Sequence, residues 1–184
     1  APHFLFNALN SVASEIHDRP DEALEMVRRI AAYLRYCLDH AAHSRCPLAD
    51  EVEAMRAYLR IQELRFEERL RTTVTVDPEA LNVLVPHMIL QALVENAVKH
   101  GLRHQDDAIE IGVTVERLDD RSIVIEVVNS GTLQPERPGR PAIGLANTRM
   151  RLHLHYPEGY ELTLKQEDDR VVARLMLRGS ACRV

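Results

Sequence analysis

Polar side chains interrupt an otherwise apolar segment of the chain, LQALVENAVKHGL at residues 90–102. They recur at helical spacing and lie side by side on a helix: Gln91, Glu95, Asn96, Lys99 and His100. One interpretation is a solvated stripe with an ion pair between Glu95 and Lys99, which are four residues apart. The other is a site for a metal-bridged polyphosphate, because Mg²⁺ takes few protein oxygens and neighbouring cations offset the phosphate charge.

Two short glycine-containing segments have the composition of ligand-binding turns. VNSG (128–131) ends a predicted strand, and AIGLAN (142–147) opens a predicted helix. Gly131 and Gly144 would let the backbone approach a ligand, and free N–H groups at a helix start attract phosphate. Glycine at a strand end is also common in ordinary turns, so each segment alone is a weak indication. The proline-rich residues between them form either a linker or a lid over a nucleotide.

The stretch PHFLFNALNSV places His3 and Asn7 one helical turn apart on a polar side. Opposite them runs an apolar stripe made of Leu5, Leu9, Val12 and Ile16. The imidazole is either a surface histidine or a nucleophile, and the two phenylalanines beside it favour packing over catalysis. No Ser-His-Asp, CxxC or HExxH arrangement occurs in the sequence.

The first half of the chain predicts helices. The second helix has apolar residues at alternating steps of three and four: Leu24, Val27, Ala31, Leu34 and Leu38. Such a heptad seam suits a hairpin or a bundle of helices. Residues 40–47 predict a linker. Residues 48–70 predict a third helix whose apolar side carries Val52, Met55, Leu59 and Ile61.

Beyond residue 70 the apolar period changes to two, which predicts strands at 71–76, 109–115, 122–128, 160–165 and 170–177. Pro86 suits a first helical turn and Gly101 a helix end, so a helix is predicted at 86–101. Another is predicted at 143–156. Helices followed by mixed helices and strands indicate an α+β fold of two modules.

The composition, net charge and number of cysteines exclude several classes of protein. Of 184 residues, 46% are hydrophobic and 28% charged, which is typical of a globular protein with a core. A net charge of −5 gives no support for direct nucleic-acid binding. The odd number of cysteines, three without metal-ligand spacing, indicates a reducing cytoplasmic setting. The sequence has neither a membrane-length apolar run nor a signal peptide, and its Ala-Pro-His start leads us to expect a fragment.

The order of these segments resembles the sensor histidine kinases of the LytS/AlgZ type. PHFLFNALNSV, LRYCL, AYLRIQELRF, LQALVENAVKHGL, VNSG and IGLANTRMRL carry the resemblance over nearly the whole chain, and PHFLFN and LVENAVKHG are its specific strings. It implies a helical dimerisation and phosphoacceptor hairpin at 1–46. A two-layer α/β sandwich of the GHKL (Bergerat) type would follow at 47–184, including the connecting helix 48–70, and would bind ATP.

The resemblance implies which residues bind the nucleotide. Helix 86–101 would carry the N-box, in which Asn96 holds Mg²⁺ while Lys99 and His100 lie near the phosphates. The two glycine boxes would supply the remaining contacts: Asn129 and Gly131 from the first box, and Gly144, Leu145 and Asn147 from the second. Residues 132–141 would be the ATP lid.

The resemblance also implies the residues of phosphoryl transfer. His3 would be the phosphoacceptor, and Asn7 would orient the water that dephosphorylates the partner. Many relatives carry an acid directly after the phosphoacceptor, but here that neighbour is Phe4. Glu95 is the candidate base in its place.

Three positions depart from the family pattern and predict a low affinity for ATP. The Asp of the first glycine box, which accepts from the adenine amino group, is Asn129 here, and a neutral acceptor binds more weakly than a charged one. The second box keeps one glycine of GxG. Asp169 and Arg170 replace the Gly-Thr pair before the last strand.

The function predicted from the resemblance is autophosphorylation of His3 from Mg·ATP and transfer to an aspartate of a response regulator, which in this family is often of the LytTR type. The chain would be the cytoplasmic, homodimeric core of an inner-membrane sensor, joined to the membrane through segments that it does not contain. Two alternatives are a catalytically degenerate GHKL scaffold and a GHKL ATPase in which Glu95 activates water.

Overall fold

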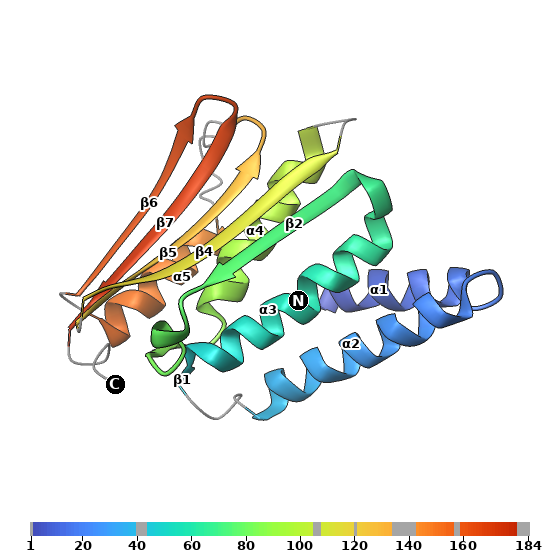
Figure 1. Ribbon diagram of the computed structural model, residues 1–184, viewed down its shortest axis with the longest axis horizontal. Coiled ribbons are helices and arrows are strands. Elements are labelled where there is room, and N and C mark those ends of the chain that lie inside the picture. Colours follow the sequence, from blue (N-terminus) through green and yellow to red (C-terminus); the bar gives the residue numbers. More distant parts are fainter. Residues whose placement is uncertain are drawn as a thin grey trace.

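The computed structural model describes residues 2–39, 44–104, 108–119, 121–133, 143–156 and 159–179 (Figure 1). Helices come first and then alternate with strands: α1 (Pro2–Glu15), α2 (Pro20–Asp39), β1 (Arg45–Pro47), α3 (Leu48–Phe66), β2 (Leu70–Val76), β3 (Leu84–Pro86), α4 (Ile89–His104), β4 (Ile109–Asp119), β5 (Ser122–Ser130), α5 (Ile143–His155), β6 (Tyr160–Glu167) and β7 (Arg170–Arg178). Short 3-10 turns lie at Glu67–Arg69 and Pro78–Ala80. No helix among these residues is long and apolar enough to cross a membrane.

Five strands form one sheet in the order β2-β4-β5-β7-β6, in which β2 and β4 are parallel and the other pairs antiparallel. Helices α4 and α5 cover one face of this sheet (Figure 1). Along β5 the buried residues Ile123, Ile125 and Val127 alternate with half-buried ones, as a sheet with one covered face requires. On the other face, Glu126 and Arg174 pair across the strands at 2.6 Å. The predicted α+β sandwich is confirmed.

The helices α1, α2 and α3 pack together beside the sheet, and their buried side chains join its core. Phe4, Met26 and Tyr33 belong to the same buried cluster as Ile111 and Leu175 of the sheet. The helical segment and the sandwich therefore share one continuous core. The predicted division into residues 1–46 and 47–184 stays a prediction.

The apolar stripes predicted for the first two helices are not the ones that this core buries. In α2 the buried residues are Ala23, Met26, Ile30, Tyr33 and Tyr36. The side chains of the predicted heptad seam are largely exposed to solvent: Leu24, Val27, Leu34 and Leu38 are 49%, 44%, 39% and 76% exposed. In α1, Phe4 and Ala8 are buried. Of the predicted stripe, Leu5 and Val12 are half-buried against the core, whereas Leu9 and, just beyond the helix, Ile16 are each 52% exposed. Both helices carry two apolar stripes, and the one with the aromatic residues faces α3.

Several predicted boundaries are wrong. Pro86 ends β3 and the fourth helix begins at Ile89, because β1 and β3 pair as a short antiparallel ribbon that the sequence did not indicate. That helix also continues past Gly101 to His104. The third helix ends at Phe66 rather than residue 70. The strands beyond residue 70 and the helix near 143–156 are confirmed within a few residues.

Candidate functional site

Helix α4 carries the polar residues of LQALVENAVKHGL and packs against the sheet with its apolar side. Leu90, Leu93, Val94 and Val98 are at most 3% exposed. Gly101 lets the helix approach the sheet, because a Cβ there would lie 2.9 Å from Cδ1 of Ile109. The helix thus lies directly on β4 and β5, and its polar residues are held at the edge of that contact.

The polar residues of α4 differ in their surroundings. Lys99 is exposed, Glu95, Asn96 and His100 are half-buried, and Gln91 is 1% exposed. The Gln91 amide donates from Nε2 to Oε1 of Glu95 at 2.9 Å. A stripe that is only partly solvated fits a binding surface better than a solvated face does.

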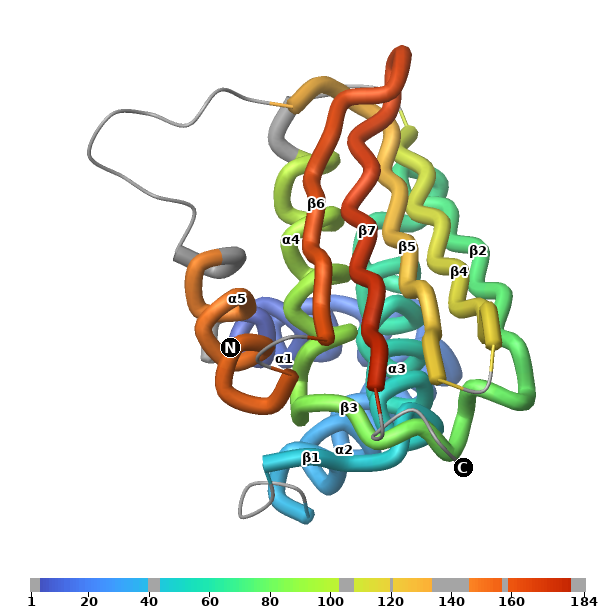
Figure 2. Tube along the Cα trace, turned by 90° about the vertical axis from the view of Figure 1, so that its left-hand side faces the viewer, coloured from blue at the N-terminus to red at the C-terminus, as the bar shows by residue number. Residues whose placement is uncertain are grey.

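The predicted first glycine box lies at the end of β5, on the side of the sheet that α4 covers. Asn129 is 4% exposed and follows Ile125 and Val127 on the covered face, and its Nδ2 donates to the carbonyl of Ser130 at 3.0 Å. The carboxyl ends of β5 and α4 lie at the same end of the molecule (Figure 2). The fold therefore brings Asn129 to the half of α4 that follows Asn96 and carries Lys99 and His100.

Gly131 turns the chain away from the sheet with a φ of 122°, a conformation that favours glycine. Its N–H donates to the carbonyl of Asp169 at 2.8 Å, and its own carbonyl accepts from Nε2 of Gln166 at 3.2 Å. Asp169, which replaces a family residue, thus anchors the glycine box through its backbone.

Helix α5 lies beside α4 on the same side of the sheet (Figure 2). It begins at Ile143, so Gly144 and Leu145 stand in its first turn, and Asn147 is exposed. The side chains of residues 143–145 lie outside the described residues, as do residues 134–141, the greater part of the predicted lid.

The predicted phosphoacceptor stands in the first turn of α1, but its side chain lies outside the described residues. Its neighbour Phe4 is buried, with its ring centroid 5.5 Å from that of Tyr33 and 4.7 Å from that of Tyr58. Burial raises the pKa of both tyrosines, and the charge of Glu95 raises each pKa further. The first turn of α1 therefore packs on the same two rings whose pKa the charge of Glu95 raises.

Asn7 lies one turn beyond His3 and is half-buried. Its carbonyl accepts from the hydroxyl of Ser11 at 3.1 Å. The two residues occupy successive turns of one helix, which is the relation that the sequence predicted.

The start of α4 is held by a buried carboxylate that sequence reasoning missed. Glu51 of α3 is 0% exposed and accepts from the backbone N–H of Leu90 at 2.9 Å, as well as from the N–H of Met88. The hydroxyl of Tyr36, on α2, donates to the same carboxylate. Because the first N–H groups of a helix have no partner within it, Glu51 caps α4 from a different helix.

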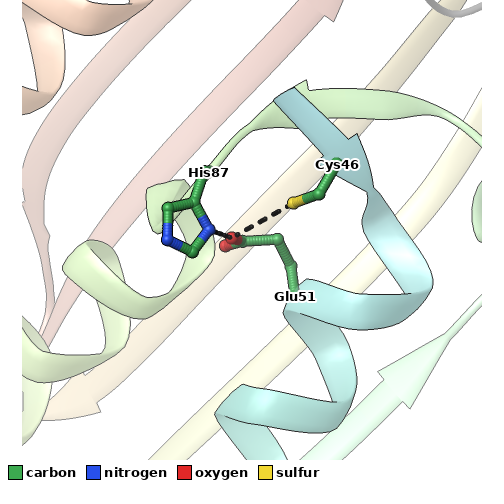
Figure 3. A group of neighbouring side chains, drawn as sticks. All are labelled: Cys46, Glu51 and His87. Atoms are coloured by element: carbon green, nitrogen blue, oxygen red, sulfur yellow. Dashed lines mark hydrogen bonds and ion pairs between the residues drawn. The ribbon is translucent and has the colours of Figure 1, made fainter. Parts of the chain in front are cut away.

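Cys46 and His87 complete the surroundings of Glu51 (Figure 3). The thiol of Cys46 lies 3.6 Å from Oε1 of Glu51, and Nδ1 of His87 lies 3.8 Å from the same oxygen and 2.9 Å from the Tyr36 hydroxyl. Burial raises the pKa of Glu51, while the bonds from Tyr36 and the backbone lower it in part. The signal for Glu51 was present in the sequence, since it stands three residues after Leu48 and four before Met55 on the apolar side of its helix.

A separate groove of about 310 Å³ lies between α2, α3 and β2, lined by none of the predicted site residues. Arg29, Arg56 and Arg60 stand along it. Arg60 pairs with Glu25 at 2.9 Å and with Glu63 at 3.5 Å, and Arg29 reaches Glu25 at 3.7 Å. The charges of Arg29 and Arg60 are thus already paired, which does not favour an anion site.

Comparison with known proteins agrees with this geometry. Residues 1–70 match the histidine kinase family. The chain is 29% identical over 183 residues to the sensor histidine kinase BtsS of Escherichia coli K12, covering 98% of this chain and 32% of BtsS. It is 29% identical over 130 residues to the sensor protein LytS of Bacillus subtilis, covering 71% of this chain and 22% of LytS. It thus spans about a third or less of these relatives' lengths.

The fold is also similar to that of the histidine kinase ThkA, solved in complex with the response regulator protein TrrA. The TM-score is 0.55 at 16% identity, over 98% of this chain and 60% of ThkA. At this identity the likeness concerns the fold, and it extends over the helices as well as the sandwich.

We predict that Glu51→Ala destabilises the fold by roughly 3 kcal/mol or more, because each buried donor left without an acceptor costs about 1–3 kcal/mol. Tyr36→Phe, which removes one donor, should cost about 1 kcal/mol. Urea unfolding measures both, with Tyr160→Phe as the control, because the bond from its hydroxyl to the carbonyl of Arg149 is exposed and 3.4 Å long. A Glu51→Ala protein as stable as the parent would show that α4 does not depend on this cap.

Proposed function

Because this chain belongs to the sensor histidine kinases of the LytS type, we propose that it is the kinase core of a two-component sensor. It would phosphorylate its own His3 from Mg·ATP and pass the phosphoryl group to an aspartate of a response regulator. We place it on the cytoplasmic side of an inner membrane, attached through segments outside this chain.

The observation that carries this proposal is the position of the N-box residues on α4 relative to the end of β5. Half-buried Asn96 stands at the middle of α4, and exposed Lys99 stands on the half of α4 whose carboxyl end lies at the same end of the molecule as the end of β5, where Asn129 and Gly131 stand. An amide oxygen is a ligand that Mg²⁺ accepts, and a cation one turn further offsets phosphate charge. The residues present therefore fit Mg·ATP, which would supply the phosphoryl group.

The Asn129 amide suits the adenine end of such a ligand. Its Nδ2 donates to Ser130, so its oxygen is the group that would accept from an exocyclic amino group. Since it carries no charge, we expect weaker binding than an aspartate would give. His100 and Asn147, from α4 and α5, would complete the phosphate side of the site with the backbone of Gly144 and Leu145.

His3 would act as the nucleophile through a neutral imidazole nitrogen. Phe4 anchors this turn of α1 on Tyr33 and Tyr58, whose pKa values respond to Glu95. The influence of the Glu95 charge on both rings supports Glu95 as the residue that takes the imidazole proton. The Glu95 carboxylate also accepts from the Gln91 amide.

The partners follow from the same proposal. ThkA was solved with a response regulator, and we propose a response regulator of the LytTR type as the partner of this chain. We also propose a homodimer formed through the seam of α2. Leu24, Val27, Leu34 and Leu38 are 39–76% exposed in the single chain, and apolar residues at heptad spacing are typical of helix pairing between chains.

Asn96→Ala should reduce Mg·ATP affinity at least ten-fold without unfolding the protein, because the variant loses the amide oxygen proposed to hold the metal. Isothermal titration with Mg·ATP measures the affinity, and Asn82→Ala, in an exposed turn, is the control. If Asn96→Ala binds like the parent, the N-box assignment is wrong. If the parent itself shows no saturable binding, the degenerate scaffold is the better description.

Asn7→Ala should keep autophosphorylation at His3 and slow dephosphorylation of the regulator several-fold, because Asn7 is proposed to orient the attacking water. His3→Gln should abolish phosphorylation. Acid-labile phosphate on the kinase and phosphate loss from the regulator report the two activities. Asn10→Ala, exposed on the same helix, is the control. Unchanged dephosphorylation in Asn7→Ala would leave Asn7 with a solvating role only.

The double variant Leu34→Glu/Leu38→Glu should convert a dimer into a monomer, because two charges would face the partner helix across an apolar seam. Light scattering gives the mass, and Leu118→Glu, 53% exposed at the end of β4, is the control. A variant that keeps the parent's dimeric mass would place the dimer contact elsewhere.

A further inference from the structure

Three side chains of the types that bind metals converge before the first turn of α4 (Figure 3). They are Cys46 of β1, Glu51 of α3 and His87, which follows β3. Their ligand atoms all lie within 4.8 Å of one another. The pairing of β1 with β3, in which Cys46 lies opposite Val85, holds Cys46 and His87 close together, and the Glu51 carboxylate points between them (Figure 3).

The capping of α4 explains why a carboxylate is buried at Glu51, but it does not explain why Cys46 and His87 lie beside that carboxylate. The N–H groups of Met88 and Leu90 and the Tyr36 hydroxyl already use the carboxylate as their acceptor. A thiol and an imidazole are not required for that cap, yet both face Oε1, at 3.6 and 3.8 Å.

The charge of the site points to a cation. Glu51 is 0% exposed, and a buried carboxylate either takes up a proton or is stabilised by an opposite charge or a metal ion. The groups around it are two N–H groups, a hydroxyl, a thiol and an imidazole, none of which carries a permanent positive charge. A divalent cation would supply the positive charge that these groups lack.

The distances agree with a tetrahedral ion of the size of Zn²⁺. Bonds of about 2.3 Å to sulfur and 2.0 Å to oxygen or nitrogen give ligand–ligand edges of about 3.5 Å for S···O and 3.3 Å for N···O. The Cys46–Glu51 edge is 3.6 Å and the His87–Glu51 edge 3.8 Å. A mixed sulfur, nitrogen and oxygen set also selects Zn²⁺ over Mg²⁺, which prefers oxygen alone.

We propose that Cys46, Glu51 and His87 bind one borderline-soft divalent cation, Zn²⁺ in particular, with the Tyr36 hydroxyl or a water as fourth ligand. The site is separate from the Mg²⁺ proposed at Asn96 and does not depend on kinase activity. His87 is 14% exposed at its side chain, which gives the ion a way in. Bound there, the ion would join α2, α3 and the start of α4.

Cobalt titration tests this site, because Co²⁺ occupies zinc sites and absorbs strongly when a thiolate binds it. The background is Cys37→Ser/Cys182→Ser, which leaves Cys46 as the one cysteine. We expect one Co²⁺ per chain with a thiolate charge-transfer band that Zn²⁺ abolishes and excess Mg²⁺ leaves unchanged. Adding Cys46→Ser should remove the band, and adding His87→Ala should weaken Co²⁺ binding at least ten-fold.

Absence of the band at stoichiometric Co²⁺ would overturn the proposal. So would a band that persists after Cys46→Ser, or His87→Ala binding as tightly as the background protein. Glu51 is left unaltered in this series because its loss is expected to destabilise the fold. Circular dichroism of each variant ensures that a lost band reports a lost ligand in a folded chain, and Tyr36→Phe, which removes no anionic ligand, should keep the band.

Discussion

The buried carboxylate of Glu51 is the contact on which the arrangement of the other parts depends. It accepts from Met88 and Leu90 at the start of α4 and from Tyr36 of α2, so one side chain of α3 fixes where two other helices lie. Because a helix is rigid along its length, fixing its first turn also fixes the position of Asn96 two turns later. The nucleotide site proposed at the far half of α4 thus rests on a bond at its near end.

A second set of interactions relates α1 to the same helix α4. Phe4 packs on Tyr33 and Tyr58, and the negative charge of Glu95 raises the pKa of both tyrosines. The shared core means that a shift of α1 or α2 cannot occur without altering the surroundings of Glu95. A movement of the helical segment would therefore affect the site proposed on α4. The bonds of Glu51 to Tyr36 of α2 and to the start of α4 form a second link between the two.

The two apolar stripes of α2 divide its contacts between the inside and the outside of the chain. The stripe with Met26 and Tyr33 is buried against α3, while Leu34 and Leu38 remain exposed. Exposed leucines at heptad spacing are costly in water unless a second surface covers them. The seam predicted from the sequence therefore has the properties of an interface between chains, although it does not form the hairpin's own contact.

The sequence by itself determined the features that depend on local pattern. Period-two alternation predicted the strands beyond residue 70, and polar residues within an apolar run identified the α4 segment and its candidate site residues, Asn96 among them. Only the tertiary structure decided which stripe of α2 faces inward, that α4 begins after Pro86, and that Cys46, Glu51 and His87 meet. The physical reason is that periodicity describes one element, whereas burial and capping depend on partners distant in the chain. Glu51 is held by donors 15 to 39 residues away, which no local pattern contains.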